Sequence, residues 1–214
     1  MNSEELANML RRWQLHCHGA ATPAVQRDAF ERIARGYGEP HRHYHTLAHV
    51  RACLELFDEV RALAHEPDTV ESAIWLHDIV YEPGRTDNEQ RSADVAVELL
   101  GRLGTSRAFR GAVQRMILAT RYEASAPPPR DNDTRVLLDI DLSIFGRPPD
   151  VFDAYDRAIR EEFAHVDEAA YRAARRRVLQ NFLDRPRIYL TDPLRDRFEQ
   201  RARENLRRAI ERLS

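Results

Sequence analysis

Hydrophobic residues recur three or four positions apart along most of the chain, which is the spacing of amphipathic helices. The first helix is expected from Ser3 to His16 behind a Ser3 cap, and the second from about Pro23 to Arg35. Further helices are expected over residues 47–63, 67–82, 88–100, 107–121, 133–145, 149–163, 167–183 and 193–213. Because no stretch has the two-residue period of a strand and no internal repeat is visible, the fold class is expected to be all-α.

The length of the chain favours one domain. With 214 residues and 43% hydrophobic content it can bury one substantial core, so residues 1–214 are expected to form a single helical bundle. Residues 1–38 are expected to add a helical N-terminal extension. The proline-rich segment 124–131 is expected to be an exposed loop inside the domain.

Composition narrows the possible partners and the compartment. The formal net charge is −2, so no global basic field is present to hold a nucleic-acid polymer or an anionic membrane. No apolar run approaches the ~20 residues of a membrane span, and the N-terminus lacks the apolar core of a signal peptide. Two cysteines are too few for a disulfide framework. We therefore expect a cytoplasmic monomer or homodimer.

One polar pair interrupts the most apolar stretch of the chain. His77-Asp78 lies within residues 73–82, and the helix around it is expected to end only near Pro83-Gly84. A carboxylate buried without compensation costs several kcal/mol, so a proton, a cation or a metal ion has to compensate Asp78.

A second buried carboxylate is expected at Asp141. Its helical neighbours, Leu137, Leu138, Ile144 and Phe145, are apolar, whereas Asp139 is expected in solvent. The alternative for Asp141 is a structural ion pair with one of the arginines, which supply all 33 cationic residues other than histidine.

Two histidines offer ring nitrogens. His45 and His49 are four positions apart, as on one helix face, and His49 lies nearer the centre of the apolar face that follows. The remaining histidines are expected to be ordinary hydrogen-bonded residues: His16, His18, His41, His43, His65 and His165.

Together, His49, His77, Asp78 and Asp141 form a mixed nitrogen and oxygen donor set. Such a set suits a divalent ion, Mn²⁺, Fe²⁺, Co²⁺, Ni²⁺, Zn²⁺ or Mg²⁺, in an open site, and it is unlike a closed cysteine-rich zinc site.

The order of these residues, a His, an adjacent His-Asp and a distant Asp, resembles the HD-domain superfamily of metal-dependent phosphohydrolases, and more narrowly its bacterial branch of predicted phosphohydrolases. The motifs that carry the resemblance are Tyr44-His45-x-x-x-His49, His77-Asp78-x-Val80-Tyr81-Glu82, Asp87-Asn88-Glu89-x-x-Ser92-Ala93 and the run from Asp141 to Gly146, with Tyr155, Ile159-Arg160, Tyr171, Arg175, Val178-Leu179 and Ile188-Tyr189 further along. By this resemblance the fold is an HD-like bundle with additional N- and C-terminal helices, and the four donors bind the metal.

The resemblance also implies roles for residues around the metal. Glu82, expected one helical turn after Asp78, orients or deprotonates water, unless it is a surface residue at a helix end. His45 supports catalysis by a hydrogen bond to phosphate or to a ligand. Arg160 and Arg175 are expected to bind the substrate only through the resemblance. Glu89 lies at a helix start where an anion or a loop can be bound, or where it serves as a cap.

These residues predict a metal-dependent phosphohydrolase acting on a small phosphorylated metabolite, possibly a nucleotide. The alternative is a non-catalytic sensor module that binds a metal ion and a nucleotide without turning it over.

Overall fold

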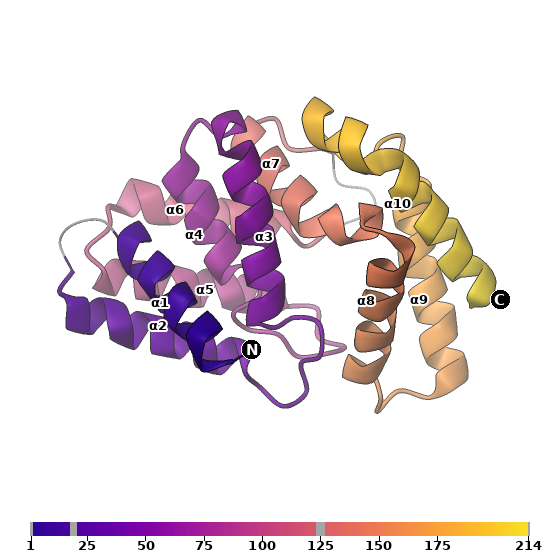
Figure 1. Cartoon of the computed structure of the whole chain (residues 1–214), viewed down its shortest axis with the longest axis horizontal. Coiled ribbons are helices and arrows are strands. Elements are labelled where there is room, and N and C mark those ends of the chain that lie inside the picture. Colours follow the sequence, from indigo (N-terminus) through magenta and orange to yellow (C-terminus); the bar gives the residue numbers. More distant parts are fainter. Residues whose placement is uncertain (1, 18–20, 123–126, 214) are drawn as a thin grey trace. The chain divides into compact units, whose positions relative to one another are not determined.

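The computed structural model describes residues 2–17, 21–122 and 127–213, and these residues form helices and no strands, which confirms the all-α prediction (Figure 1). The helices are α1 (Ser3–His16), α2 (Pro23–Tyr37), α3 (Leu47–Val60), the 3₁₀ helix η1 (Arg61–Leu63), α4 (Pro67–Leu76), α5 (Asn88–Arg102), α6 (Arg107–Ala119), α7 (Asn132–Asp141), the 3₁₀ helix η2 (Leu142–Gly146), α8 (Pro149–Glu162), α9 (Glu168–Leu183) and α10 (Asp192–Arg212). Among the described residues, no helix is long and apolar enough to cross a membrane.

The chain divides into two compact units. Unit 1 is Met1–Arg121, with α1 to α6, and unit 2 is Tyr122–Ser214, with α7 to α10. The boundary adjoins the proline-rich segment, of which residues 124–126 lie outside the described part. Pro127 and Pro128 are exposed and lie outside regular structure, as expected. The expectation of one domain is not tested by this division and stays a prediction.

Unit 1 is built around α4. This helix packs against α3, α5 and α6, and α1 packs against α2 (Figure 1). Residues 69–76 of α4 are all buried, and the Trp75 ring meets Trp13 edge-on at 5.4 Å and Phe30 at 6.2 Å. A helix buried on every side belongs in the interior of a domain, so whatever follows Leu76 also begins inside the protein.

A buried carboxylate on α4 links it to its neighbours. Glu71 accepts hydrogen bonds from Arg12 Nε of α1 (3.1 Å) and Arg61 Nη1 of η1 (2.5 Å). Burial raises the pKa of Glu71, but the charges of His16, Arg61 and Arg12 outweigh this effect and lower the pKa overall. The carboxylate is therefore held in its ionised form by cations from two other elements.

The interior of unit 2 is formed around η2. Helices α7, α8 and α10 pack on η2, and α9 packs on α10. A Cβ added to Gly146 would lie 2.5 Å from Phe198 Cβ, so only glycine permits α10 to approach this closely. Asn205 of α10 donates to Phe145 O (2.8 Å) and Arg147 O (3.0 Å), and this amide satisfies carbonyls at the end of η2.

The two aspartates of α7 have exchanged their expected environments. Asp139, expected in solvent, is fully buried, whereas Asp141 is only half-buried. Asp139 accepts hydrogen bonds from Leu190 N (2.7 Å), Thr191 N (2.7 Å) and Thr191 Oγ1 (2.6 Å). The prediction was wrong because it considered only one face of α7, while residues 136–140 are all buried. Asp139 fixes the segment that leads into α10.

Replacing Asp139 by Asn should lower the free energy of unfolding by about 2 kcal/mol, because the amide cannot accept all three of these hydrogen bonds. Urea denaturation followed by far-ultraviolet circular dichroism measures the change. The exposed Asp196 of α10 serves as the matched control, and Asp196→Asn should change stability by less than about 0.5 kcal/mol. Equal effects of the two substitutions would contradict the proposed role of Asp139.

Candidate metal site

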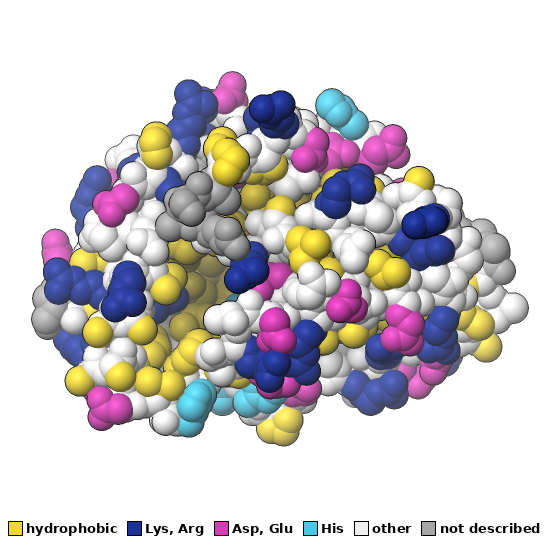
Figure 2. All heavy atoms as spheres, turned by 180° about the vertical axis from the view of Figure 1, so that it is seen from behind, with side chains coloured by type: hydrophobic (Ala, Val, Ile, Leu, Met, Phe, Trp, Pro, Cys, Tyr) yellow, Lys and Arg dark blue, Asp and Glu magenta, His cyan; other side chains and the backbone are white. Residues whose placement is uncertain are grey.

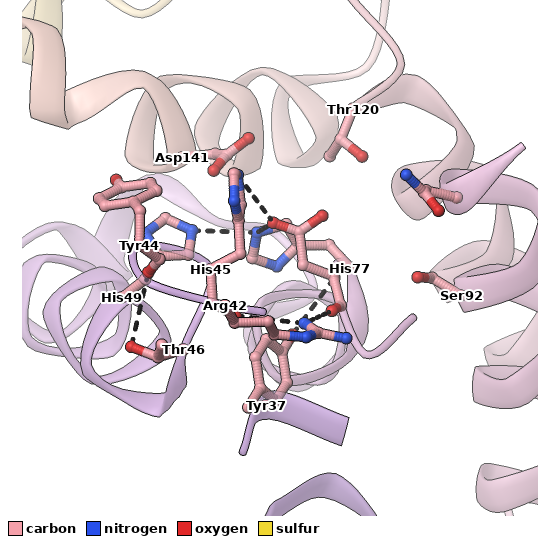
Figure 3. Close-up of polar contacts among 12 residues, drawn as sticks. Tyr37, Arg42, Tyr44, His45, Thr46, His49, His77, Ser92, Thr120 and Asp141 are labelled. Atoms are coloured by element: carbon pink, nitrogen blue, oxygen red, sulfur yellow. Dashed lines mark hydrogen bonds and ion pairs between the residues drawn. The ribbon is translucent and has the colours of Figure 1, made fainter. Parts of the chain in front are cut away.

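Three side chains of unit 1 bring their donor atoms together at the end of α4. His49 Nε2 lies 3.2 Å from His77 Nε2, and His77 Nε2 lies 3.2 Å from Asp78 Oδ2. One donor atom from each residue lies within 4.8 Å of the other two. Both imidazoles are buried, and the side chain of Asp78 is 17% exposed. Figure 3 shows the ring of His49 turned toward that of His77. The expected grouping of these three residues is therefore present in one unit.

The segment that carries His77 and Asp78 was expected to be helical, and this expectation was wrong. Helix α4 ends at Leu76, and residues 77–82 follow as an irregular segment. Tyr37 Oη accepts a hydrogen bond from Asp78 N (3.2 Å), and Ser92 Oγ accepts from Val80 N (3.1 Å). Side chains from α2 and α5 thus replace the helical partners of these amides.

Arg42 holds the carbonyl groups of the same segment. Its side chain is fully buried, and it donates from Nη1 to Asp78 O (2.6 Å) and from Nη2 to Ile79 O (3.1 Å) (Figure 3). Nη1 also donates to His45 O (3.2 Å), and Nε donates to Glu39 Oε2 (3.0 Å). One guanidinium therefore fixes the backbone on both sides of the histidine cluster.

The start of α5 completes this support. Asn88 accepts from Glu82 N (3.1 Å) through Oδ1 and donates to Glu82 O (3.0 Å) through Nδ2. Ser92 Oγ also donates to Val80 O (3.1 Å). Asn88 and Ser92 therefore hold the loop that precedes α5.

The hydrogen bond on the far side of the His77 ring sets its tautomer. His77 Nδ1 lies 3.0 Å from Ile74 O, and a carbonyl oxygen only accepts, so Nδ1 carries the proton. In the neutral ring, Nε2 then presents its lone pair to His49 and Asp78. A carboxylate oxygen 3.2 Å from such a lone pair is repelled unless a proton or a cation lies between them.

The distances and the donor types fit a divalent ion. Two donors that each lie about 2.0–2.2 Å from one ion are roughly 2.8–3.6 Å apart at angles between 90° and 109°. The two separations of 3.2 Å fall in this range. Metal-binding imidazoles commonly donate their other ring N–H to a backbone carbonyl, as His77 does to Ile74. Two imidazoles and a carboxylate suit a transition metal ion of intermediate softness.

His45 lies beside the cluster, before α3 begins. The expectation that His45 and His49 share a helix face was wrong, because α3 starts at Leu47 behind the Thr46 cap. The His45 ring stacks on Tyr81 with centroids 4.0 Å apart, and its Nε2 lies 4.0 Å from Asp78 Oδ2. This position suits a supporting group for Asp78 rather than a second ligand on the same helix.

Glu82 does not lie on a helix with Asp78, because α4 ends six residues earlier than expected. Its side chain is 47% exposed and accepts from Arg91 Nη1 at 2.8 Å, with Arg85 Nε at 3.7 Å. The hydrogen bond from Arg91 lowers the pKa of Glu82. These contacts match the surface alternative considered for this residue, and its role toward water stays a prediction.

Glu89 differs from Glu82 in its environment. It lies in the first turn of α5 and is half-buried. Burial raises the pKa of Glu89, and the negative charge of Asp78 raises it further, while Arg121 opposes the rise. Glu89 is therefore the acid of α5 whose protonation is coupled to the cluster.

Asp141 lies in unit 2 at the last position of α7. It accepts a hydrogen bond from Tyr122 Oη (2.7 Å), and Tyr122 has a positive φ of 28°, a strained conformation for a bulky residue. Asp141 is therefore a positioned carboxylate. Its participation as the fourth metal ligand stays a prediction.

The two arginines expected at the substrate also lie in unit 2. Arg160 donates to Phe163 O (2.7 Å), Val166 O (3.3 Å) and Glu168 Oε2 (3.0 Å), contacts that hold the connection between α8 and α9. Arg175 is buried and donates to Asp156 Oδ1 (3.1 Å) from Nη2. Both guanidinium groups thus have structural contacts, and their binding of substrate stays a prediction.

Sequence reasoning missed the residues that hold the site in place. Tyr37 and Arg42 contact backbone groups, so no pattern of side-chain types reveals them, and Asn88 was named only as part of a motif without its contact to Glu82. Only the position of Arg42 within the histidine-rich stretch 41–49 could have drawn attention to it. Cys53 was also missed as a neighbour, and its Sγ lies 3.7 Å from His49 Nε2.

No known protein family, curated protein or solved structure matches this chain.

Replacing Arg42 by Met should lower the free energy of unfolding of unit 1 by about 3 kcal/mol, because it leaves buried carbonyls without donors. The same change should speed hydrogen exchange at residues 77–82. Both tryptophans, Trp13 and Trp75, lie in unit 1, so tryptophan fluorescence in urea follows its unfolding. The control is the exposed Arg35. If Arg35→Met is as destabilising as Arg42→Met, the interpretation of Arg42 is wrong.

Proposed function

We propose that unit 1 binds a divalent metal ion through His49, His77 and Asp78, and that this ion serves the hydrolysis of a small phosphorylated metabolite, possibly a nucleotide. The observation that carries the proposal is the convergence of two imidazole nitrogens and a carboxylate oxygen. His77 Nε2 lies 3.2 Å from His49 Nε2 and 3.2 Å from Asp78 Oδ2. Three electron-rich atoms this close together need a proton or a cation among them.

The proposed activity rests on the order of the motifs, which resembles that of the HD-domain phosphohydrolases, and on access to the cluster. The side chains of His45 and Asp78 keep 18% and 17% of their surface exposed, so the carboxylate side of the cluster can be reached by solvent. A divalent ion at this position supplies a Lewis acid that polarises a phosphoryl oxygen. The mixed donor set suits Mn²⁺, Fe²⁺, Co²⁺, Ni²⁺ or Zn²⁺ better than Mg²⁺, which prefers oxygen donors.

The residues around the donors have separate tasks in this proposal. His77 is kept in one tautomer by Ile74 O, so it needs no proton loss to bind an ion. His45, stacked on Tyr81, orients Asp78 or donates to a phosphate oxygen. Burial raises the pKa of Glu89, whereas the hydrogen bond from Arg91 lowers that of Glu82, so Glu89 is the acid of the two that holds a proton more readily.

A second candidate is the non-catalytic sensor that holds a metal ion and a nucleotide. The exposed position of Glu82 and its pairing with Arg91 favour it, because the acid expected to act on water is bound elsewhere. The absence of phosphate release across nucleoside phosphates and sugar phosphates, together with thermal stabilisation by one nucleotide, would support the sensor over the hydrolase.

The proposal predicts that Asp78→Ala and His77→Ala each lower metal affinity at least about 100-fold and abolish phosphate release. Elemental analysis of the purified proteins and a phosphate-release screen with the identified metal measure both effects. His165 is exposed in unit 2, and His165→Ala should retain metal and activity. Turnover by a metal-free Asp78→Ala protein would disprove the hydrolase.

Participation of Asp141 has its own test. If Asp141 is the fourth ligand, Asp141→Asn should lower metal affinity by about 10- to 100-fold, because an amide is a weaker and uncharged donor. Titration with the identified metal, monitored by calorimetry, measures the change. Asp150→Asn, at an exposed aspartate of α8, is the control. An unchanged affinity in Asp141→Asn would limit the site to donors of unit 1.

A further inference from the structure

Unit 2 contains a half-buried arginine, Arg185, that follows the end of α9 at Leu183. Its guanidinium carbon lies over the Phe182 ring, 4.5 Å from the centroid, and over the Tyr122 ring at 5.7 Å. Within the described part of the chain, this guanidinium donates no hydrogen bond and forms no ion pair. Burial lowers the pKa of Arg185, while the neighbouring Tyr122 opposes the change. The positive charge is therefore partly removed from water without a negative partner.

The acids around the segment that carries Arg185 are bound by other groups. Asp184 accepts a hydrogen bond from Gln180 Nε2 at 2.7 Å. Glu199 of α10 accepts from Arg203 Nε at 2.8 Å. Neither carboxylate forms an ion pair with Arg185, so the counter-charge has to come from a ligand or from solvent ions.

The backbone of Arg185 is fixed from α10. Arg203 donates from Nη1 to Leu183 O (2.9 Å) and from Nη2 to Arg185 O (2.8 Å). Phe182 is buried, and its ring packs edge-on against Phe145 with the centroids 5.0 Å apart. The guanidinium is thus positioned before a ligand arrives, which reduces the entropy lost on binding.

The free donors determine the chemistry of the ligand. An aromatic ring attracts a guanidinium through its face but leaves the five N–H groups, which point outward in the plane of the guanidinium, without acceptors. This planar fork matches two oxygens of a phosphate group. Arg160 and Arg175, by contrast, already donate to Phe163 O and Asp156.

We propose that Arg185, stacked on Tyr122 and Phe182, binds the phosphate group of the small phosphorylated metabolite. The choice of phosphate rests on the proposed function, whereas binding at Arg185 requires no turnover. The role expected for Arg160 and Arg175 at the substrate then belongs to Arg185.

The test uses inorganic phosphate as the probe and the full chain as the receptor. The Nε–H resonance of Arg185, assigned by its absence from the spectrum of Arg185→Met, should shift saturably with phosphate and not with chloride. In calorimetric titrations, Arg185→Met should weaken phosphate binding at least about tenfold. Arg185→Lys should weaken it only about threefold, because the ammonium keeps the charge but lacks the fork. A resonance that shows no saturable shift would overturn the proposal.

Arg187→Met is the matched control, since Arg187 is exposed and lies two residues further along the same segment. It should bind phosphate as the native protein does. Methionine at position 185 can still cover the two rings, so circular dichroism should show that Arg185→Met is folded. Native phosphate affinity in folded Arg185→Met, or an equal loss in Arg187→Met, would also overturn the proposal.

An Asp78→Ala background separates this site from the proposed metal ion, which could itself bind phosphate. In that background phosphate should still shift the Arg185 resonance. Loss of the shift would mean that phosphate is held through the metal, and the proposal would be wrong. If phosphate binding depends on Arg185 but no substrate is hydrolysed, the hydrolase fails while the Arg185 site stands.

Discussion

The end of α4 is the constraint on which unit 1 depends. A helix buried on all sides has to end inside the protein, and its last carbonyls and the following amides then need partners other than water. Arg42 supplies donors for the carbonyls of Asp78 and Ile79, while Tyr37 and Ser92 supply acceptors for the amides of Asp78 and Val80. These contacts let the chain leave the helical path directly after Leu76. Because of that departure, the His77 ring lies next to His49 and the Asp78 carboxylate lies next to His77.

Buried polar side chains occur at two positions along α4 and the residues that follow it. Glu71 and Ser72 lie in its middle, where Arg12, Arg61 and His16 surround them, and the His-Asp pair lies past its end. In both places, buried polar groups are matched by partners from other helices, so neither cluster forms until those helices pack. The use of arginine matters at the end of α4. One planar guanidinium reaches three carbonyls and a carboxylate, which a lysine ammonium with three donors could not do.

Much of the fold could be predicted from the chain, and the failures have physical causes. Apolar periodicity predicted the α-helices other than α4 close to their positions, because amphipathic helices pack by one face. It failed for α4, whose surroundings are apolar on every side and whose end carries no glycine or proline. It failed again for Asp139, because residues of α7 are buried on more than one face. The grouping of His49, His77 and Asp78 was predicted from charge burial, whereas the backbone contacts of Arg42, Tyr37 and Asn88 follow from tertiary packing alone.

The way the cluster is supported determines how a metal ion would affect stability. The backbone around His77 and Asp78 is fixed by hydrogen bonds from α2, α5 and Arg42, and the surrounding core contains Trp13, Phe30 and Trp75. These contacts do not involve the donor atoms, so unit 1 has the means to fold without an ion, in contrast to a zinc finger. The converging lone pairs nevertheless repel each other where neither a proton nor a cation lies among them. An ion that removes this repulsion binds a cluster that is already positioned, so little binding energy is lost to ordering the chain.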